Sequence, residues 1–339
     1  MAKRSLVTGG LGFIGRHLVE QLQAAGEQVR VLDLHLPEQP LPGVEYLQGS
    51  VLDQDQVRTA MEGVEWVFHL AANANLWAPR QQDFITLNQL GTRQVLHAAL
   101  DVGIKRLVHT STEAVLKNAR QPPSAVINES ILLTLEDMAG PYCRSKFLAE
   151  QEVQAAVARG LEAVIVNPSL PIGPGDHHLT PPSRMILGFL NGDYPAFLES
   201  TFNLIDVRDV AQGHILAAEK GLIGERYILG SQDVHLSQLL QMLEDLTGLP
   251  MPKNQIPYWL AFSFSLLEEF LADHITHQPP SAPLTGVKLA RFHANLDTTK
   301  AKQKLELICR PITHSLLDTL RWLDSNQLLK RVALKNIHH

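Results

Sequence analysis

The chain has 339 residues, of which 45% are apolar and 19% are charged, the proportions of an ordinary globular protein. Its formal net charge of −6 gives no reason to expect a nucleic-acid partner, which would call for a basic surface. The two cysteines, Cys143 and Cys309, lie far apart and match no metal-ligand spacing, so we expect no metal site and a reducing, cytoplasmic environment. The most apolar stretch, 256–272, contains Pro257 and two Glu residues and is too short and too interrupted to span a bilayer.

Short apolar segments alternate with helical patterns through the first two-thirds of the chain, which is typical of a parallel sheet with crossover helices. Ile14, Leu18, Leu22 and Ala25 recur at helical spacing, and Gly26 suits the end of that helix. The fold class expected is therefore α/β, with a Rossmann-type doubly wound parallel sheet. Segments rich in Val, Ile and Leu, as expected for strands buried on both faces, predict strands at 5–9, 28–34, 44–49, 65–72, 106–112 and 162–169.

The pattern changes after residue 170, where Pro and Gly become frequent and helices mix with short strands. Residues 236–248 predict a helix that ends in Gly. We expect a dinucleotide-binding domain over 1–170, to which elements from about 203–230 return. A smaller, mixed α/β substrate-binding lobe on the C-terminal side would comprise 171–202 and 231–335.

The loop TGGLGFIG, residues 8–15, follows the first predicted strand and opens the first predicted helix. It contains Gly10-x-Gly12-x-x-Gly15 and, equally, Gly9-x-x-Gly12-x-x-Gly15. Glycines at such a turn let backbone N–H groups approach a pyrophosphate, and the helix N-terminus adds a favourable dipole. The loop therefore predicts a bound dinucleotide, with a simple tight turn as the alternative interpretation.

Asp33 ends the second predicted strand, 18 residues after Gly15 (33 − 15 = 18). A carboxylate at this place can accept hydrogen bonds from the ribose hydroxyls and repels a 2′-phosphate, which favours NAD. Arg16 and Arg30 are close enough in sequence to reach a phosphate, so NADP is the alternative cofactor.

Tyr142 and Lys146 stand four residues apart in the stretch GPYCRSKFLAE and would share one helix face. Gly140 and Pro141 suit the start of that helix. The ordinary pKa of Tyr, about 10, is too high for a general base at neutral pH, but a nearby ammonium would lower that pKa. The pair is therefore a candidate for proton exchange with a substrate hydroxyl group.

Three hydroxyl residues, Thr110, Ser111 and Thr112, end the predicted strand 106–112. Carboxyl ends of parallel strands form the ligand crevice of open α/β sheets, so a hydroxyl here can hold a substrate oxygen. The alternative is that these side chains bond only the local backbone.

The order and spacing of these motifs resemble those of the extended short-chain dehydrogenase/reductases, the NAD-dependent epimerase/dehydratase family. Within it, the chain looks most like the dihydroflavonol-4-reductase-like branch, which includes proteins labelled hopanoid-associated sugar epimerases and adjoins the 3β-hydroxysteroid dehydrogenases. The resemblance covers nearly the whole chain. It is carried by TGGLGFIG, Asp33, HLAA (69–72), LNQLGT (87–92), HTST (109–112), YCRSK (142–146), NPS (167–169), LWAPR, VIVNPSLPIGPGD and NLIDVRDVAQGHILA.

The resemblance implies roles at the matching positions. Tyr142 would be the acid/base, and Lys146 would hold the nicotinamide ribose and adjust Tyr142. Thr112 would bind the substrate oxygen, with Ser111 as its less favoured stand-in, and Asn88 would support the site from a neighbouring helix. The implied cofactor contacts are Gly9, Gly12, Phe13, Ile14, Gly15, Asp33, Ser50, Val51, Leu70, Ala71, Ala72, Asn88, Tyr142, Lys146 and Pro168.

Two positions depart from the family's pattern. Ser50 replaces an acidic residue that often meets the adenine amine, with Asp53 as a nearby substitute. Phe202 stands where sugar-nucleotide epimerases usually carry an Arg for the substrate diphosphate, and Phe cannot replace a bidentate Arg. Arg184 and Arg208 lie nearby without matching that position.

Aromatic residues of the second lobe suit a flat or lipid-like substrate, although apolar residues at helical spacing usually form core. They are Phe189, Phe197, Phe202, Tyr258, Trp259, Phe262 and Phe264. The segment 256–272 could also touch a membrane surface, but its two adjacent Glu residues argue against contact with anionic lipid.

The sequence thus predicts an NAD(P)-dependent oxidoreductase that interconverts a secondary alcohol and a ketone on a small, apolar or flat substrate. One alternative is an epimerase or dehydratase that regenerates its cofactor within each cycle. Another is a regulator that binds the dinucleotide without chemistry. We expect a cytoplasmic homodimer, paired through helices 84–103 and 141–160, with a small-molecule substrate, no nucleic-acid partner and no integral membrane segment.

Overall fold

The large sheet forms the centre of the molecule. The computed structural model describes residues 3–118, 125–292 and 295–330. Within these ranges, seven parallel strands form one sheet, in the spatial order β10 (Arg226–Leu229), β7 (Ala163–Pro168), β5 (Arg106–Thr110), β4 (Trp66–His69), β1 (Arg4–Thr8), β2 (Gln28–Asp33) and β3 (Glu45–Gln48). After β3 the chain crosses over and β4 pairs with the other side of β1, so the carboxyl ends of β1 and β4 flank a crevice typical of dinucleotide-binding sheets. The predicted Rossmann-type architecture is confirmed.

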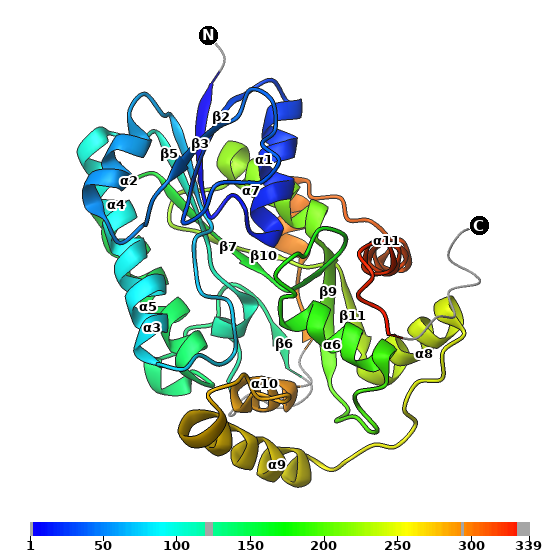
Figure 1. Ribbon diagram of the computed structural model, residues 1–339. Coiled ribbons are helices and arrows are strands. Elements are labelled where there is room, and N and C mark those ends of the chain that lie inside the picture. Colours follow the sequence, from blue (N-terminus) through cyan, green and yellow to red (C-terminus); the bar gives the residue numbers. More distant parts are fainter. Residues whose placement is uncertain (1–2, 119–124, 293–294, 331–339) are drawn as a thin grey trace.

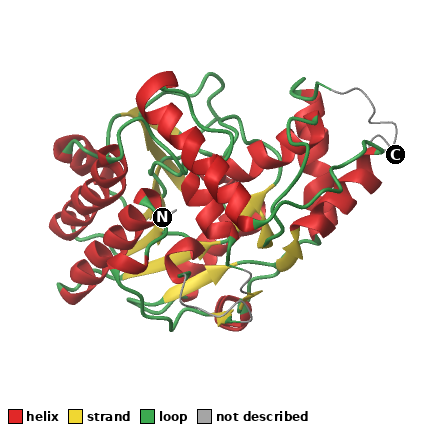
Figure 2. Cartoon of the chain, turned by 90° about the horizontal axis from the view of Figure 1, so that it is seen from below, coloured by secondary structure: helices red, strands yellow, loops and turns green. Residues whose placement is uncertain are grey.

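Helices cover both faces of this sheet (Figures 1 and 2). On one face lie α1 (Phe13–Ala24) and α7 (Val207–Lys220), which share a core with strand residues such as Val31. On the other face lie α2 (Gln54–Met61), α4 (Gly91–Val102) and α5 (Pro141–Ala158). Because both faces are buried, the strands are dense in apolar residues rather than alternating, which is why the sequence revealed them.

A smaller sheet lies beside the large one and consists of β11 (Gln232–His235), β9 (Thr201–Asp206) and β8 (Leu170–Ile172). It packs against α6 (Pro181–Asn191), α8 (Leu236–Thr247) and α11 (Ile312–Ser325) around a separate apolar core. The short strands β6 (Val126–Ile127) and β12 (Asn295–Leu296) pair with each other. Figure 1 shows α9 (Tyr258–Leu271) at the outer edge of the molecule, with α10 (Leu284–Ala290) between it and the rest of the chain.

The remaining elements are single turns and short helices. They are α3 (Gln82–Phe84), the π-helices η1 (Ile85–Leu90), η4 (Ala272–Thr276) and η5 (Ala301–Leu305), and the 3₁₀-helices η2 (Glu113–Leu116) and η3 (Leu135–Asp137). The single helix expected over 84–103 is therefore divided by η1, a widened turn that repetitive apolar spacing does not reveal.

Elements that follow residue 200 belong to both sheets. Strand β9 pairs with β8 and β11 in the smaller sheet, whereas α7 and β10 return to the large one. The proposed division into a dinucleotide domain and a substrate lobe stays a prediction, and its final residues 331–335 lie outside the described ranges. Within those ranges, no helix is both long and apolar enough to cross a membrane.

Candidate active site

The glycine loop brings three backbone segments into close approach. Gly9 has φ +70, and a Cβ there would lie 2.7 Å from the amide nitrogen of Ala71. A Cβ on Gly15 would collide with the carbonyl oxygen of Gly9. Helix α1 begins directly afterwards, and Gly12 at its N-cap has no side chain to occupy the first amides. Backbone N–H groups and a helix N-terminus are what a pyrophosphate requires, so these residues fit a dinucleotide.

Asp33, at the end of β2, lies where the adenosine ribose is expected to bind. Asp33 is partly exposed, and its Oδ2 accepts a hydrogen bond from the backbone nitrogen of Leu11 at 3.0 Å. This bond fixes the carboxylate beside the glycine loop. Arg30 is not available for a phosphate, because its buried guanidinium donates to the carbonyl oxygen of Ala60 at 2.8 Å and to Glu45. The expectation that Arg30 could reach a 2′-phosphate is therefore wrong, which strengthens the case for NAD.

Ser50 and the exposed Asp53 both make local hydrogen bonds in the region expected for adenine. Ser50 Oγ accepts from the backbone nitrogen of Leu52 at 3.2 Å. Asp53 Oδ1 caps α2 by accepting from the nitrogens of Asp55 and Gln56 at 3.1 and 3.0 Å. Asp53 thus serves as the cap of α2 through its Oδ1, and a role for it at adenine stays a prediction.

Asn88 joins the loop after β4 to the helix that carries Tyr142. It is fully buried, and its Oδ1 accepts from the nitrogen of Asn73 at 2.7 Å. Its Nδ2 donates to Ser145 Oγ at 2.8 Å, and Ser145 lies on α5. Asn88 therefore fixes the loop after β4 relative to α5, and its expected contact with the cofactor stays a prediction.

Other residues expected at the cofactor lie along the same edge of the sheet. Gly9 meets Leu70 and Ala71, and Ala72 follows directly. Val51 is buried against Gly91, and Pro168 is buried at the end of β7. Phe13 and Ile14 begin α1 and pack inward rather than extending into solvent. Whether each contacts the cofactor stays a prediction.

Tyr142 and Thr112 meet at the carboxyl edge of the sheet. Pro141 opens α5 after Gly140, as the sequence predicts, and Tyr142 in its first turn is buried. The Thr112 side chain lies close enough to Tyr142 to lower the pKa of its phenol, and Thr112 Oγ1 accepts a hydrogen bond from the backbone nitrogen of Ala114 at 3.3 Å. Thr110 points elsewhere, because its Oγ1 lies 2.8 Å from His214 Nε2. Of the three consecutive hydroxyl residues, Thr112 is therefore the one that acts on Tyr142, while Ser111 Oγ is buried and lacks a partner within the described residues.

The pKa of Tyr142 is raised rather than lowered, which corrects the expectation from the sequence. Burial is the main cause, since it disfavours the phenolate, and the nearby Thr112 side chain opposes it only in part. The nearby Glu113 carboxylate, in a buried ion pair with Lys117 at 2.7 Å, raises the pKa further. Tyr142 is thus a protonated phenol at neutral pH, suited to donate a proton.

Lys146 lies one turn beyond Tyr142 and is also buried. Its Nζ donates to the carbonyl oxygen of Thr110 at 2.5 Å. Burial lowers the pKa of Lys146 to about 8, and the Glu150 carboxylate opposes this effect. The Lys146 ammonium is therefore fixed at the end of β5, close to the segment that carries Thr112.

Asn167 and Glu150 support the site, and sequence reasoning gave them no role. Asn167 Nδ2 donates to the carbonyl oxygen of Thr112 at 3.0 Å and to Glu150 Oε1 at 2.8 Å. Glu150 is fully buried and forms an ion pair with Arg226, 2.8 Å from Nε to Oε2. The spacing of Glu150 four residues after Lys146 would have indicated a shared helix face.

A row of buried histidines lies beneath the site. His69 and His109 are neighbours on β4 and β5, with ring centroids 5.5 Å apart, and His214 reaches them through Thr110. Burial lowers the pKa of His69 to about 3 and that of His214 to about 4, and it lowers the pKa of His109 well below its usual value. All three are neutral at physiological pH.

We expect acid to destabilise the protein steeply. Below pH about 6.5 the unfolded chain protonates these three histidines while the folded chain does not, so the free energy of unfolding should fall by about 1.4 kcal/mol per pH unit for each. Urea unfolding between pH 7 and about 4 measures the slope. His109→Phe should reduce this slope by the contribution of one histidine. The substitution breaks no hydrogen bond, because neither ring nitrogen of His109 has a partner within the described residues. Equal slopes for the two proteins would contradict this account.

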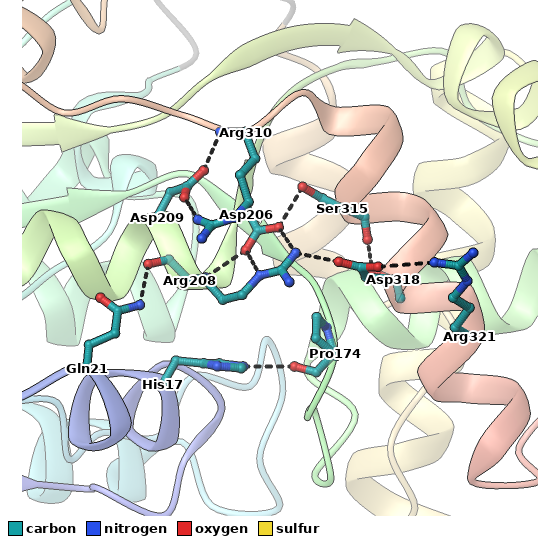
Figure 3. Close-up of polar contacts among 11 residues, drawn as sticks. His17, Gln21, Pro174, Asp206, Arg208, Asp209, Arg310, Ser315, Asp318 and Arg321 are labelled. Atoms are coloured by element: carbon teal, nitrogen blue, oxygen red, sulfur yellow. Dashed lines mark hydrogen bonds and ion pairs between the residues drawn. The ribbon is translucent and has the colours of Figure 1, made fainter. Parts of the chain in front are cut away.

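Arg208 is not free to bind a substrate diphosphate. Figure 3 shows Arg208 between two carboxylates, with Nη2 at 2.6 Å from Asp206 and 2.8 Å from Asp318. Arg184 donates to Asn75 Oδ1 at 2.8 Å, which places it beside the loop after β4. Phe202 packs partly buried against the core of the smaller sheet.

The aromatic residues of the second lobe do not gather around one cavity. Phe189 and Phe197 are buried in the core of the smaller sheet, whereas Trp259 and Phe264 are exposed on α9. Helical spacing cannot distinguish these environments, so the expected aromatic lining is wrong for this set as a whole.

Comparisons with known proteins agree with this geometry. The model of the NAD dependent epimerase/dehydratase family matches residues 5–230. A protein of Synechocystis named putative dihydroflavonol 4-reductase is 39% identical over 97% of both chains. Sterol demethylase protein B of Methylococcus capsulatus is 32% identical over 94% of this chain and 97% of its own. The crystal structure of gox2253 covers 97% of this chain and 100% of its own, with a TM-score of 0.83 and 31% identity. The chain therefore belongs to the NAD dependent epimerase/dehydratase family and is an NAD-dependent oxidoreductase of the extended short-chain dehydrogenase/reductase type.

Proposed function

We propose that this oxidoreductase interconverts a ketone and a secondary alcohol on a small, flat or apolar substrate, with Tyr142, Thr112 and Lys146 as its catalytic residues. The observation that carries the proposal is the buried Tyr142 beside Thr112 at the carboxyl edge of the sheet, with Lys146 Nζ donating to the carbonyl oxygen of Thr110 at 2.5 Å. A protonated phenol can donate its proton to the substrate oxygen when the ketone is reduced, and the same group takes the proton back when the alcohol is oxidised.

Each residue has its own role in the proposed reaction. NAD supplies or accepts a hydride at the nicotinamide ring when it is bound. Tyr142 donates its phenolic proton to the substrate oxygen as that oxygen gains negative charge, and Thr112 donates a second hydrogen bond to it. Lys146 holds the ribose hydroxyls and adds positive charge near the developing alkoxide. The amides of the glycine loop and Asp33 fix the cofactor's pyrophosphate and adenosine ribose.

Two observations favour a flat, weakly polar substrate. The Synechocystis relative is named for a dihydroflavonol and the Methylococcus relative for a sterol, which are both ring-bearing molecules with few charges. Arg208 is held by two carboxylates, and Phe202 occupies the position expected for a diphosphate-binding Arg. These features speak against a sugar nucleotide.

A panel of ketones tests the proposal. Purified protein and NADH would be offered flavonoid, steroid and sugar-nucleotide ketones, and NADH absorbance would be followed. We expect net NADH oxidation with a flavonoid or steroid ketone. Turnover confined to sugar nucleotides would refute the substrate class.

A sugar epimerase or dehydratase is the second candidate. Arg184 favours it, because its guanidinium lies beside the loop after β4, donates to Asn75 Oδ1 and could take a diphosphate. Such an enzyme would convert its substrate without net NADH release. Arg184→Ala would then lower affinity for a sugar nucleotide and leave ketone reduction unchanged.

We expect Asp33→Ser to reduce the preference for NADH over NADPH by at least about tenfold, because removal of one negative charge beside a 2′-phosphate removes a repulsion of this order. The ratio of kcat/KM for the two cofactors measures the effect. Asp53→Ser is the matched control, since that carboxylate caps α2. An unchanged ratio in Asp33→Ser would remove Asp33 from the cofactor site.

We also propose that the protein is a cytoplasmic homodimer. Helices α4 and α5 lie side by side on one face, with a shallow hollow between them and an ion pair from Arg93 to Glu152 at 2.6 Å. Such a helix pair can meet its own copy across a twofold axis. The two cysteines are free thiols, which supports a reducing compartment. Sedimentation velocity tests the oligomeric state.

A further inference from the structure

The outer face of α9 presents the largest group of exposed apolar side chains described for this chain. Trp259 is 67% exposed and Leu267 is 58% exposed, although both are large and apolar. Their exposed neighbours on α9 and the following turn are Leu260, Phe264, Leu266, Phe270 and Ile275. We call this set, from Trp259 to Ile275, the α9 face. Isolated exposed apolar residues are common, but a contiguous face of this kind marks an interaction surface.

The charged residues of α9 are turned away from this face. Glu268 accepts hydrogen bonds from Ser281 Oγ at 2.6 Å and from the nitrogen of Ala282 at 3.1 Å. Glu269 accepts from the nitrogen of Leu284 at 2.8 Å, at the start of α10. Both carboxylates therefore accept hydrogen bonds from the segment that leads into α10, and α9 has no other charged residue. The objection that two acidic residues would repel an anionic surface does not hold for the outer face.

Cations stand next to the α9 face. Arg291 is exposed, and its guanidinium lies 5.3 Å from the ring of Tyr258 on α9. Lys288 is partly exposed on α10. Neither forms a salt bridge with any residue that the structure describes. Burial raises the pKa of the Glu269 carboxylate and nearby Lys288 opposes this effect, so Arg291 is the more available cation at the edge of the α9 face. An apolar, Trp- and Phe-bearing helix face with a cation at its edge is complementary to a bilayer surface that contains anionic lipid.

The α9 face is attached to the candidate active site. Trp77 Nε1 donates to Asp273 Oδ1 at 2.8 Å, which ties the turn after α9 to the loop after β4. Thr285 on α10 packs so closely against Gly140 that a Cβ on Gly140 would collide with it. Gly140 is the cap of the helix that carries Tyr142. A surface seated on α9 would therefore lie over the segment that covers the catalytic helix.

We propose that the α9 face, with Arg291 and Lys288, binds the surface of a membrane that contains anionic lipid. The side chains enter the interface between headgroups and acyl chains while the helix lies in the plane of the bilayer. This surface is independent of the proposed reaction, and α10 connects it to Gly140 at the start of α5.

Vesicle sedimentation with the full-length protein tests the proposal. Vesicles of phosphatidylcholine alone and of phosphatidylcholine mixed with phosphatidylglycerol would be compared at low and high salt. We expect binding to the mixed vesicles, weakened at high salt. Trp259→Ser with Phe264→Ser should weaken partitioning at least about tenfold, because two large apolar side chains are removed from the interface. Lys288→Glu and Arg291→Glu should each weaken it at least about fivefold on the mixed vesicles.

The matched control is Leu132→Ser with Ile308→Ser, which removes two exposed apolar side chains outside α9. It should bind vesicles as the parent does. Thermal unfolding and NADH binding would show that each variant remains folded. The proposal is overturned if the parent fails to sediment with mixed vesicles, or if the control loses binding equally. It is also overturned if the α9 variant only converts a dimer to a monomer, since a second copy would then cover the face.

Discussion

Replacement of Tyr142 by Phe is expected to lower kcat for ketone reduction by about two to four orders of magnitude, the range for loss of a general acid. The Phe ring fills the same buried place but has no proton to donate to the substrate oxygen. Affinity for NADH should be nearly unchanged, because the glycine loop and Asp33 are intact. Steady-state kinetics and a direct binding titration measure the two effects separately.

The control for this variant is Tyr46→Phe. Tyr46 also carries a partly buried hydroxyl, which accepts from the nitrogen of Leu41 at 3.3 Å, but it lies beside β3, away from Thr112. It should keep full activity. Thr112→Val should lower kcat in the same direction as Tyr142→Phe, and the double variant should be scarcely worse than Tyr142→Phe, because the two hydroxyls act as one unit. Additive losses would show that Thr112 acts elsewhere.

Glu150→Ala is expected to reduce the free energy of unfolding by about 3–5 kcal/mol, the usual result of breaking a buried ion pair. The substitution leaves the Arg226 guanidinium without its carboxylate partner and removes an acceptor from Asn167. Urea unfolding at neutral pH measures the loss. Glu150→Gln should recover part of it, because an amide oxygen can still accept from Asn167.

Glu152→Ala supplies the comparison on the same helix. Glu152 is paired with Arg93, but that pair is partly exposed, and such pairs contribute only about 0–1 kcal/mol. If Glu150→Ala and Glu152→Ala lowered the free energy of unfolding equally, the buried Glu150 ion pair would contribute no more than the exposed Glu152 pair. If Glu150→Ala also lowered kcat more than its residual folded fraction explains, Asn167 would be confirmed as the link that holds Thr112.

The parallel sheet and its cofactor loop could be predicted because their determinants are local. Strands buried on both faces appear as apolar segments, and Gly9, Gly12 and Gly15 mark a turn that larger residues cannot adopt. The start of α5 at Pro141 follows from the conformational limits of proline. These features need no knowledge of residues far away in the chain.

The parts that were missed depend on contacts between distant segments. The spacing of Tyr142 and Lys146 predicts a shared helix face, but not the burial that raises the pKa of Tyr142. Asn167 reaches Glu150 and Thr112 only once β7 pairs with β5 and α5 packs on the sheet. The inward orientation of Glu268 depends on Ser281, 13 residues later, so it could not be predicted from the neighbouring sequence.

The most direct test of the account follows the hydride itself. The protein would be supplied with NADH deuterated at the transferable position of C4, together with the ketone that gives turnover, and the product would be analysed by mass spectrometry and NMR. The account predicts one deuterium on the new carbinol carbon for each NADH oxidised, and loss of this transfer in Tyr142→Phe. Product formed with no net NADH oxidation and no deuterium would contradict it and identify an epimerase instead.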